Sequence, residues 1–224
     1  MLCFGDNMYP INLVLTNRRC AVVGGGEVAT RKILRLVEAG ADVTIIAPTL
    51  TEKLTDMVKV NKVSWNKTTY SKGLLQDFFC VFCATDDAVV NRQAAAEARA
   101  AGALVNVASA PELCDFTVPG VVKRGSVTFA VSSDGASPAF VRLLRKDLER
   151  RYHEGFGEMA EFLQNLRQEL IKSGDSSRTR ELLWKQVLKE DIIQLILDKD
   201  LKRAKNEIRN SINCAGIKSS DSTR

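Results

Sequence analysis

Short apolar runs alternate with amphipathic segments along the first half of the chain. The apolar runs predict five strands, at residues 20–23, 43–47, 62–66, 80–84 and 103–108. Apolar residues recurring every three to four positions predict three helices between them, at 27–40, 51–60 and 87–102. The strand runs show little polar alternation, which is typical of a parallel sheet covered by helices on both faces. The pattern therefore predicts an α/β fold of the Rossmann-like, doubly wound kind over residues 1–113.

The pattern changes in the second half of the chain. β-type sequence lies on both sides of a turn at Lys123–Gly125, within the segment 115–135. The segment 137–152 has helical periodicity, and it begins with Ser137 as N-cap and Pro138 at the first helical position. This half therefore starts with a small α+β region.

Helical sequence dominates the last third of the chain. Its apolar stripe predicts a core or a dimer face and consists of Leu182, Leu183, Val187, Leu188, Ile192, Leu195 and Ile196. The polar end of the chain is typical of a disordered tail. Beyond the first domain, we expect the divisions 114–150, 151–212 and 213–224.

A glycine-rich turn joins the first predicted strand to the first predicted helix. Gly24, Gly26 and Ala29 give the spacing G-x-G-x-x-A. The first glycine permits the tight turn, the second lets a pyrophosphate approach the backbone, and the small third residue lets helix and strand pack closely. The amides at the start of the helix then face the phosphates. The turn therefore predicts a dinucleotide site.

The acidic residue that usually binds the cofactor ribose is missing. It is expected about 20 residues after the turn, at the end of the second strand, where this chain has "IIAPTL". Asp42 lies at the wrong end of that strand, so we expect backbone groups near Pro48 and the Thr49 hydroxyl to hold the ribose. Arg31 and Lys32 are not placed for a 2′-phosphate, which favours NAD and leaves NADP open.

Composition narrows the other possibilities. The 224 residues carry a formal net charge of +5, which suits an anionic ligand but is more often a solubilising surface. Cys80 and Cys83 form a C-x-x-C inside a predicted strand, and the chain has one histidine, so we expect reduced core thiols and no metal site. We expect His153 to be a surface or helix-end residue.

No apolar stretch reaches the ~20 residues of a membrane helix, so we expect a cytoplasmic protein with no membrane or nucleic-acid partner.

Several longer stretches carry a specific resemblance. "VVGGGEVATRK", "EAGADVTIIAP", "CATDD", "NVASAPELCDFTVPGVVKRG" and "TFAVSSDGASPAFVRLLRKDLE" resemble the siroheme synthase N-terminal family, from about residue 9 to residue 150. Members are precorrin-2 dehydrogenases, and some are also sirohydrochlorin ferrochelatases. The resemblance implies oxidation of precorrin-2 to sirohydrochlorin with NAD, within siroheme biosynthesis. It also implies a homodimer, with 114–150 as dimerisation region and the substrate in a cleft beside the nucleotide domain.

The resemblance also implies a set of cofactor contacts. The glycine turn and the first helical residues would meet the pyrophosphate, the end of the second strand would meet the adenosine, and the end of the fourth would meet the nicotinamide. The residues concerned are Gly24, Gly25, Gly26, Glu27, Val28, Pro48, Thr49, Ala84 and Thr85.

One departure from the family pattern concerns the acid–base group. The family commonly has N-x-x-D-x-P after the fifth strand, whereas here Ser109 stands at the aspartate position. A hydroxyl cannot accept a proton near neutral pH without a partner base. Asp86, Glu112 and Asp115 are near in sequence and could compensate, so we take Ser109, Asp86 and Asp115 as the catalytic candidates. The change casts more doubt on metal insertion, which needs a base, than on oxidation, which needs mainly positioning.

The loop "SSDGASP" has a structural and a functional interpretation. It is a well-capped strand-to-helix turn, and its serines could also hold a substrate carboxylate with Arg142 one turn inside the helix. The resemblance supports the second interpretation, since Ser133 matches a serine described as phosphorylatable, although Asp134 stands where glycine is usual. The expected substrate contacts are Asn106, Ser132, Ser133, Ser137 and Arg142.

Two other functions stay open at this point. A nucleotide-sensing domain of a transport system also begins with a glycine turn, but such domains usually keep the acidic ribose residue, and they give no reason for "AVSSDGASPAFVRLLR". A family member that binds tetrapyrroles without turning them over would explain Ser109.

Overall fold

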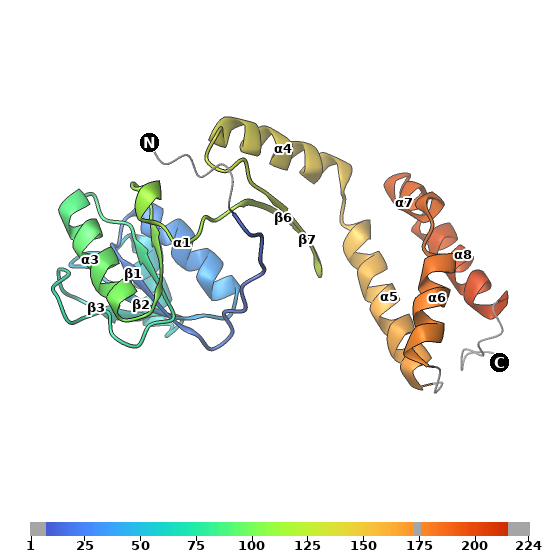
Figure 1. The fold of residues 1–224 in the computed structure, drawn as a ribbon, viewed down its shortest axis with the longest axis horizontal. Coiled ribbons are helices and arrows are strands. Elements are labelled where there is room, and N and C mark those ends of the chain that lie inside the picture. The colour runs from blue at the N-terminus through green and yellow to red at the C-terminus, as the bar shows by residue number, and fades with distance from the viewer. Residues whose placement is uncertain (1–7, 173–175, 215–224) are drawn as a thin grey trace. The chain divides into compact units, whose positions relative to one another are not determined.

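The computed structural model describes residues 8–172 and 176–214 (Figure 1). Within it the chain divides into two compact units, Met1–Val118 and Pro119–Arg224. Each unit has its own core and is described by itself.

The first unit is built on a five-stranded parallel sheet with strand order β3-β2-β1-β4-β5. The strands are β1 (Arg19–Val23), β2 (Asp42–Ile46), β3 (Ser64–Asn66), β4 (Cys80–Cys83) and β5 (Leu104–Val107). The order reverses between β1 and β4, which is the place where open α/β sheets bind ligands. The predicted Rossmann-like fold is confirmed.

Helices cover both faces of this sheet. On one face α1 (Glu27–Glu38) and α2 (Glu52–Lys59) pack through side chains that include Ile33 and Leu54. On the other face α3 (Ala88–Ala100) packs through small buried alanines. Their small side chains let α3 pack closely against the sheet.

The predicted boundaries hold to within about two residues. Differences of two residues occur at the ends of α1 and α3 and at the start of β3, which begins at Ser64 and not at Lys62. The Lys62 amide donates to the Met57 carbonyl and so still closes the end of α2. A short 3-10 helix, Pro111–Leu113, follows β5 and was not predicted.

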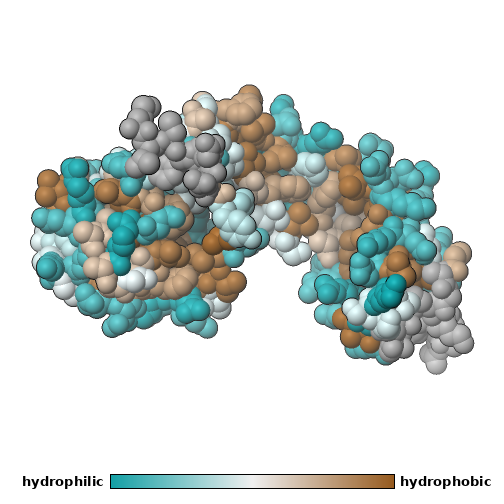
Figure 2. Space-filling view, in the orientation of Figure 1, coloured by the Kyte–Doolittle hydropathy of each residue, from teal (hydrophilic) through white to brown (hydrophobic). Residues whose placement is uncertain are grey.

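The second unit starts with a hairpin and one helix. Strands β6 (Gly120–Arg124) and β7 (Val127–Val131) pair antiparallel around the expected turn, and α4 (Pro138–Arg151) contacts both strands. The predicted cap is confirmed, since the Ser137 hydroxyl accepts from the Phe140 amide at 3.2 Å. No residue of α4 is fully buried, and apolar surface gathers over this helix (Figure 2).

Four helices with a core of their own complete the second unit: α5 (Gly155–Lys172), α6 (Ser177–Val187), α7 (Glu190–Leu197) and α8 (Leu201–Cys214). The predicted stripe is partly core. Leu183, Val187, Ile192 and Ile196 are buried, whereas Leu182 and Leu188 are exposed. Of the predicted tail, residues 215–224 lie outside the described residues, while 213 and 214 end α8. No helix in the described parts of the chain is long and apolar enough to span a bilayer.

Candidate functional site

The β1–α1 turn requires glycine at its first position. Gly24 has φ +120°, and its amide donates to the Ile46 carbonyl at 3.0 Å. A Cβ here would lie 2.4 Å from the Ala84 carbonyl oxygen. Gly24 therefore lets the ends of β1, β2 and β4 approach one another, as expected for the first glycine of such a turn.

Gly25, between the two glycines of the motif, ties the turn to the β2–α2 loop. A Cβ on Gly25 would lie 2.1 Å from the Thr49 carbonyl oxygen, and the Gly25 carbonyl accepts from the Thr51 amide at 3.0 Å. Buried Thr30 donates to the Gly26 carbonyl at 2.9 Å and lies 3.0 Å from the Thr51 hydroxyl. The two loops at the switch point of the sheet are therefore held as one rigid piece.

Gly26 differs from its two neighbours. Its φ of −84° and ψ of −169° suit any residue, and a Cβ built on it meets nothing within 4 Å. It is the N-cap of α1 and makes no side-chain cap bond. The fold therefore gives no reason for glycine here, whereas a phosphate approaching the first amides of α1 does. Ala29 is fully buried, as expected for the small third residue of the turn.

The end of β2 carries no carboxylate, as the sequence indicated. Ala47 is buried, whereas Pro48 and Thr49 beyond it are exposed. Asp42 lies at the opposite end of the strand, where it is the register partner of Arg19 in β1. Groups on the protein available to a ribose at this place are the Thr49 hydroxyl and the backbone.

The residues after β4 are held by a buried amide that the sequence analysis did not identify. Asn91, on α3, is 2% exposed. Its Oδ1 accepts from the Thr85 amide at 3.2 Å and from the Thr85 hydroxyl at 2.8 Å, and its Nδ2 donates to the Thr85 carbonyl at 2.9 Å. Nδ2 also lies 3.5 Å from the Ser109 hydroxyl. Asn91 therefore joins the proposed nicotinamide side of the site to Ser109.

Of the three catalytic candidates, Ser109 and Asp86 share one edge of the sheet, whereas Asp115 is bonded elsewhere. Ser109 and Asp86 are both exposed at the carboxyl edge of the sheet, and no hydrogen bond to the Asp86 side chain is found within the described residues. Asp115 instead accepts from Arg99 at 2.9 Å and from the Val105 amide at 2.9 Å, in the middle of β5. These bonds favour a structural role for Asp115, and its suggested part in compensating for Ser109 stays a prediction.

Asn106, expected to contact the substrate, has both ends of its side-chain amide bonded to the protein. It is 6% exposed, its Nδ2 donates to the Phe116 carbonyl at 3.0 Å, and its Oδ1 accepts from Lys32 Nζ at 2.7 Å. Both ends of the amide are thus bonded inside the first unit. Direct contact with a substrate would have to displace one of these bonds, so the geometry favours an indirect role.

The serine loop lies in the second unit. The Ser133 hydroxyl accepts from the Ser137 amide at 3.1 Å, and Ser137 caps α4. Asp134 has φ +48°, a conformation that aspartate adopts more readily than most residues, which explains how it can stand at a glycine position. Ser132 and Arg142 are exposed. The loop therefore has a structural explanation, and its binding role stays a prediction.

The predicted burial of the C-x-x-C pair is confirmed. Cys80 and Cys83 are buried and free, and burial raises the pKa of each thiol to about 12. No group of metal-binding side chains occurs among the residues described. His153 accepts from the Gly155 amide through Nδ1, so its Nε2 donates to the Ile196 carbonyl at 2.6 Å. It lies at the α4–α5 junction, as a helix-end residue should.

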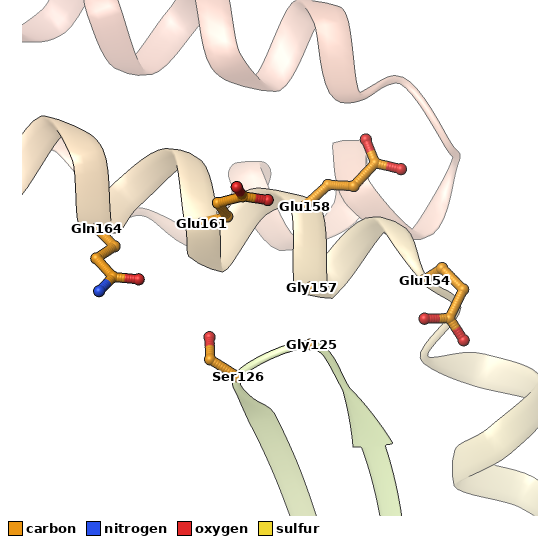
Figure 3. Close-up of a pocket in the computed structure, with 7 residues that line it drawn as sticks. All are labelled: Gly125, Ser126, Glu154, Gly157, Glu158, Glu161 and Gln164. Atoms are coloured by element: carbon orange, nitrogen blue, oxygen red, sulfur yellow. The ribbon is translucent and has the colours of Figure 1, made fainter.

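A cleft of about 450 Å³ lies between the hairpin turn and α5 in the second unit (Figure 3). Its lining includes Glu154, Glu158 and Glu161. Three carboxylates repel phosphates and polycarboxylates alike. The glycine turn is therefore the better candidate for an anionic ligand.

Comparisons with known proteins match three regions of the chain and one solved structure. Residues 11–120 match a family described as "Putative NAD(P)-binding", 124–151 match "Sirohaem biosynthesis protein central" and 155–212 match "Sirohaem synthase dimerisation region". A solved structure titled "SirC, precorrin-2 dehydrogenase" is similar with a TM-score of 0.73 and 26% identity, covering 89% of this chain and 100% of that one.

Two of the similar proteins are siroheme synthases. The siroheme synthase of Nitrosococcus oceani is 39% identical over 187 residues, 84% of this chain and 40% of that protein. The siroheme synthase of Methylobacillus flagellatus is 34% identical over 207 residues, 92% of this chain and 44% of that protein. The chain thus spans about two fifths of the length of these relatives. On these matches, which run from residue 11 to residue 212, the chain belongs to the siroheme synthase N-terminal family.

Proposed function

We propose that this chain catalyses the NAD-dependent oxidation of precorrin-2 to sirohydrochlorin in siroheme biosynthesis. The open space at Gly26, in front of the first amides of α1, is the observation that carries the proposal. Similarity to a structure titled as a precorrin-2 dehydrogenase over 89% of the chain supports the choice of reaction.

The cofactor contacts follow from the geometry of the turn. Gly24 and Gly25 shape it, and the amides of Gly26, Glu27 and Val28 are the donors for the pyrophosphate. At the two ends of the cofactor, the proposed contacts are Pro48, Thr49, Ala84 and Thr85. NAD, when bound, supplies the hydride acceptor, and the protein supplies position. The preference for NAD over NADP is part of the proposal.

Ser109 limits what the site can do with protons. Its oxygen lies within hydrogen-bond distance of the Asn91 amide donor, and its own O–H is left to donate to a substrate. No base within the described residues is bonded to Ser109, so the hydroxyl can orient the macrocycle but not deprotonate it. We therefore propose oxidation as the main activity and weak metal insertion at most. Asp86 remains the candidate for a nearby acid–base group.

The second unit supplies the remaining parts of the proposal. Residues 155–212 match a dimerisation region, and Phe140 and Leu143 of α4 expose 52% and 59% of their surface. We propose a homodimer, located in the cytoplasm, that buries this face. Ser132, Ser133, Ser137 and Arg142 are the proposed contacts for substrate carboxylates.

Turnover tests the proposal directly. Purified protein is mixed with enzymatically generated precorrin-2 and NAD, and NADH is followed together with the absorbance of sirohydrochlorin. Equal formation of both products supports the dehydrogenase, with Gly26→Asp as the negative control. Tight tetrapyrrole binding without NADH would favour the second candidate, a non-catalytic tetrapyrrole-binding protein, for which the missing base at Ser109 is the specific observation.

A further inference from the structure

A half-buried lysine lies beside the proposed nicotinamide end of the site. Lys32 extends from α1, its Nζ donates to Asn106 Oδ1 at 2.7 Å, and the same Nζ lies 5.1 Å from the centre of the Phe82 ring. Within the described residues no carboxylate forms an ion pair with it. An ammonium group carries three N–H donors, and the structure provides a protein acceptor for one of them.

This arrangement is costly for the protein alone. A half-buried cation without a counter-ion lowers stability, and its contacts with Asn106 and the Phe82 ring offset part of that cost. A neutral apolar residue at position 32, packed against Phe82, would avoid the cost. Burial lowers the pKa of Lys32, and the positive charges of Arg35 and Arg31 lower it further. Neither arginine has an ion pair in the described part of the chain. The site therefore has an uncompensated positive charge that an anion would balance.

The lysine is also well placed in the sheet. Phe82 pairs in register with Asn106 across β4 and β5. Ala84, two residues after Phe82, lies on the same face of the sheet, about 7 Å further toward the carboxyl edge. Nζ thus lies near the place proposed for the nicotinamide ring, where the reacting carbon of a substrate must come.

We propose that Lys32 binds a carboxylate of the tetrapyrrole substrate, and that Asn106 holds the ammonium group in position for it. This inference rests on the proposed function, and it gives Asn106 an indirect part in substrate binding. A cofactor phosphate has the same chemistry as a ligand for Lys32, and the experiment separates the two sources.

The test uses variants of one helix. Lys32→Met removes the charge, Lys32→Gln removes the charge but keeps an amide donor for Asn106, and Arg35→Met removes an exposed charge from the same helix as matched control. We expect KM for precorrin-2 to rise about 10- to 100-fold in both Lys32 variants, as for loss of a charge-assisted hydrogen bond. The kcat, the Kd for NAD and the behaviour of Arg35→Met should stay within about twofold of the wild type.

Stability separates this role from a structural one. If Lys32 serves the ligand, the urea midpoint of unliganded Lys32→Met is equal to or above that of the wild type. A lower midpoint with unchanged KM would overturn the inference, and so would a rise in the Kd for NAD in place of KM. If the wild type does not oxidise precorrin-2, the proposed function fails, and fluorescence titration with uroporphyrin, a polycarboxylate porphyrin, then tests Lys32 alone. Equal uroporphyrin affinity in Lys32→Met and Arg35→Met would overturn it.

Discussion

Substitution of Gly26 by aspartate should abolish NAD binding while leaving the fold as stable as before. The backbone angles at Gly26 are ordinary, and a Cβ there meets nothing within 4 Å. Gly26 is also the N-cap of α1, a position where aspartate is preferred over glycine by a few tenths of a kcal/mol. The free energy of unfolding should therefore stay within about 0.5 kcal/mol of the wild type, or rise slightly.

The loss of binding follows from charge. The new carboxylate would compete with the pyrophosphate for the first amides of α1. Two like charges about 4 Å apart repel by about 4 kcal/mol at an effective dielectric constant of about 20, and solvent screening reduces this value. A loss of at least about 2.7 kcal/mol, or 100-fold in Kd, is the expected result.

Gly24→Ala is the matched contrast. Its φ of +120° predicts backbone strain of about 1–3 kcal/mol for alanine. The Ala84 carbonyl oxygen, 2.4 Å from the new Cβ, adds a steric clash to this cost. Urea unfolding gives the stability of each variant, and titration calorimetry gives the Kd for NAD. The reasoning is refuted if Gly26→Asp binds NAD as the wild type does, or if it unfolds as readily as Gly24→Ala.

Three further predictions concern other residues. Ser109→Asp should raise metal insertion into sirohydrochlorin, because the new carboxylate supplies a base and the Asn91 amide can hold it in place. A fall in metal insertion with the fold intact would contradict this. Asp115→Asn should lower the melting temperature but not the turnover of folded protein, because Asp115 bonds to backbone and Arg99; a specific loss of turnover would restore its catalytic role. Burial, aided by Asp42, raises the pKa of Cys20 from 9.0 to about 11, so its contribution to stability is present below pH 9 and lost between about pH 9 and 11; urea midpoints that stay constant over that range would exclude it.

The parts of the fold that the sequence predicts are those set by residues close together in the chain. Each strand and α-helix of the first unit follows from a run of neighbouring residues, and the need for Gly24 follows from the turn itself. The helix cap at Ser137 is equally local.

The contacts that build the site are not local. Lys32 and Asn106 are 74 positions apart, and Asn91 and Ser109 are 18 apart. No periodicity indicates that such residues meet. One weak signal was available for Asn91, a polar residue on the alanine-rich face of an amphipathic helix. Nearness in sequence likewise does not show that the Asp115 side chain bonds to the Val105 amide of β5, ten positions earlier.

A crystal structure with NAD and a tetrapyrrole tests the central claim most directly. The account predicts that the pyrophosphate accepts hydrogen bonds from the Gly26 and Glu27 amides, and that the macrocycle lies against the nicotinamide near Thr85 and Ser109. An empty glycine turn at saturating NAD, or a tetrapyrrole bound far from the carboxyl edge of the sheet, would contradict it.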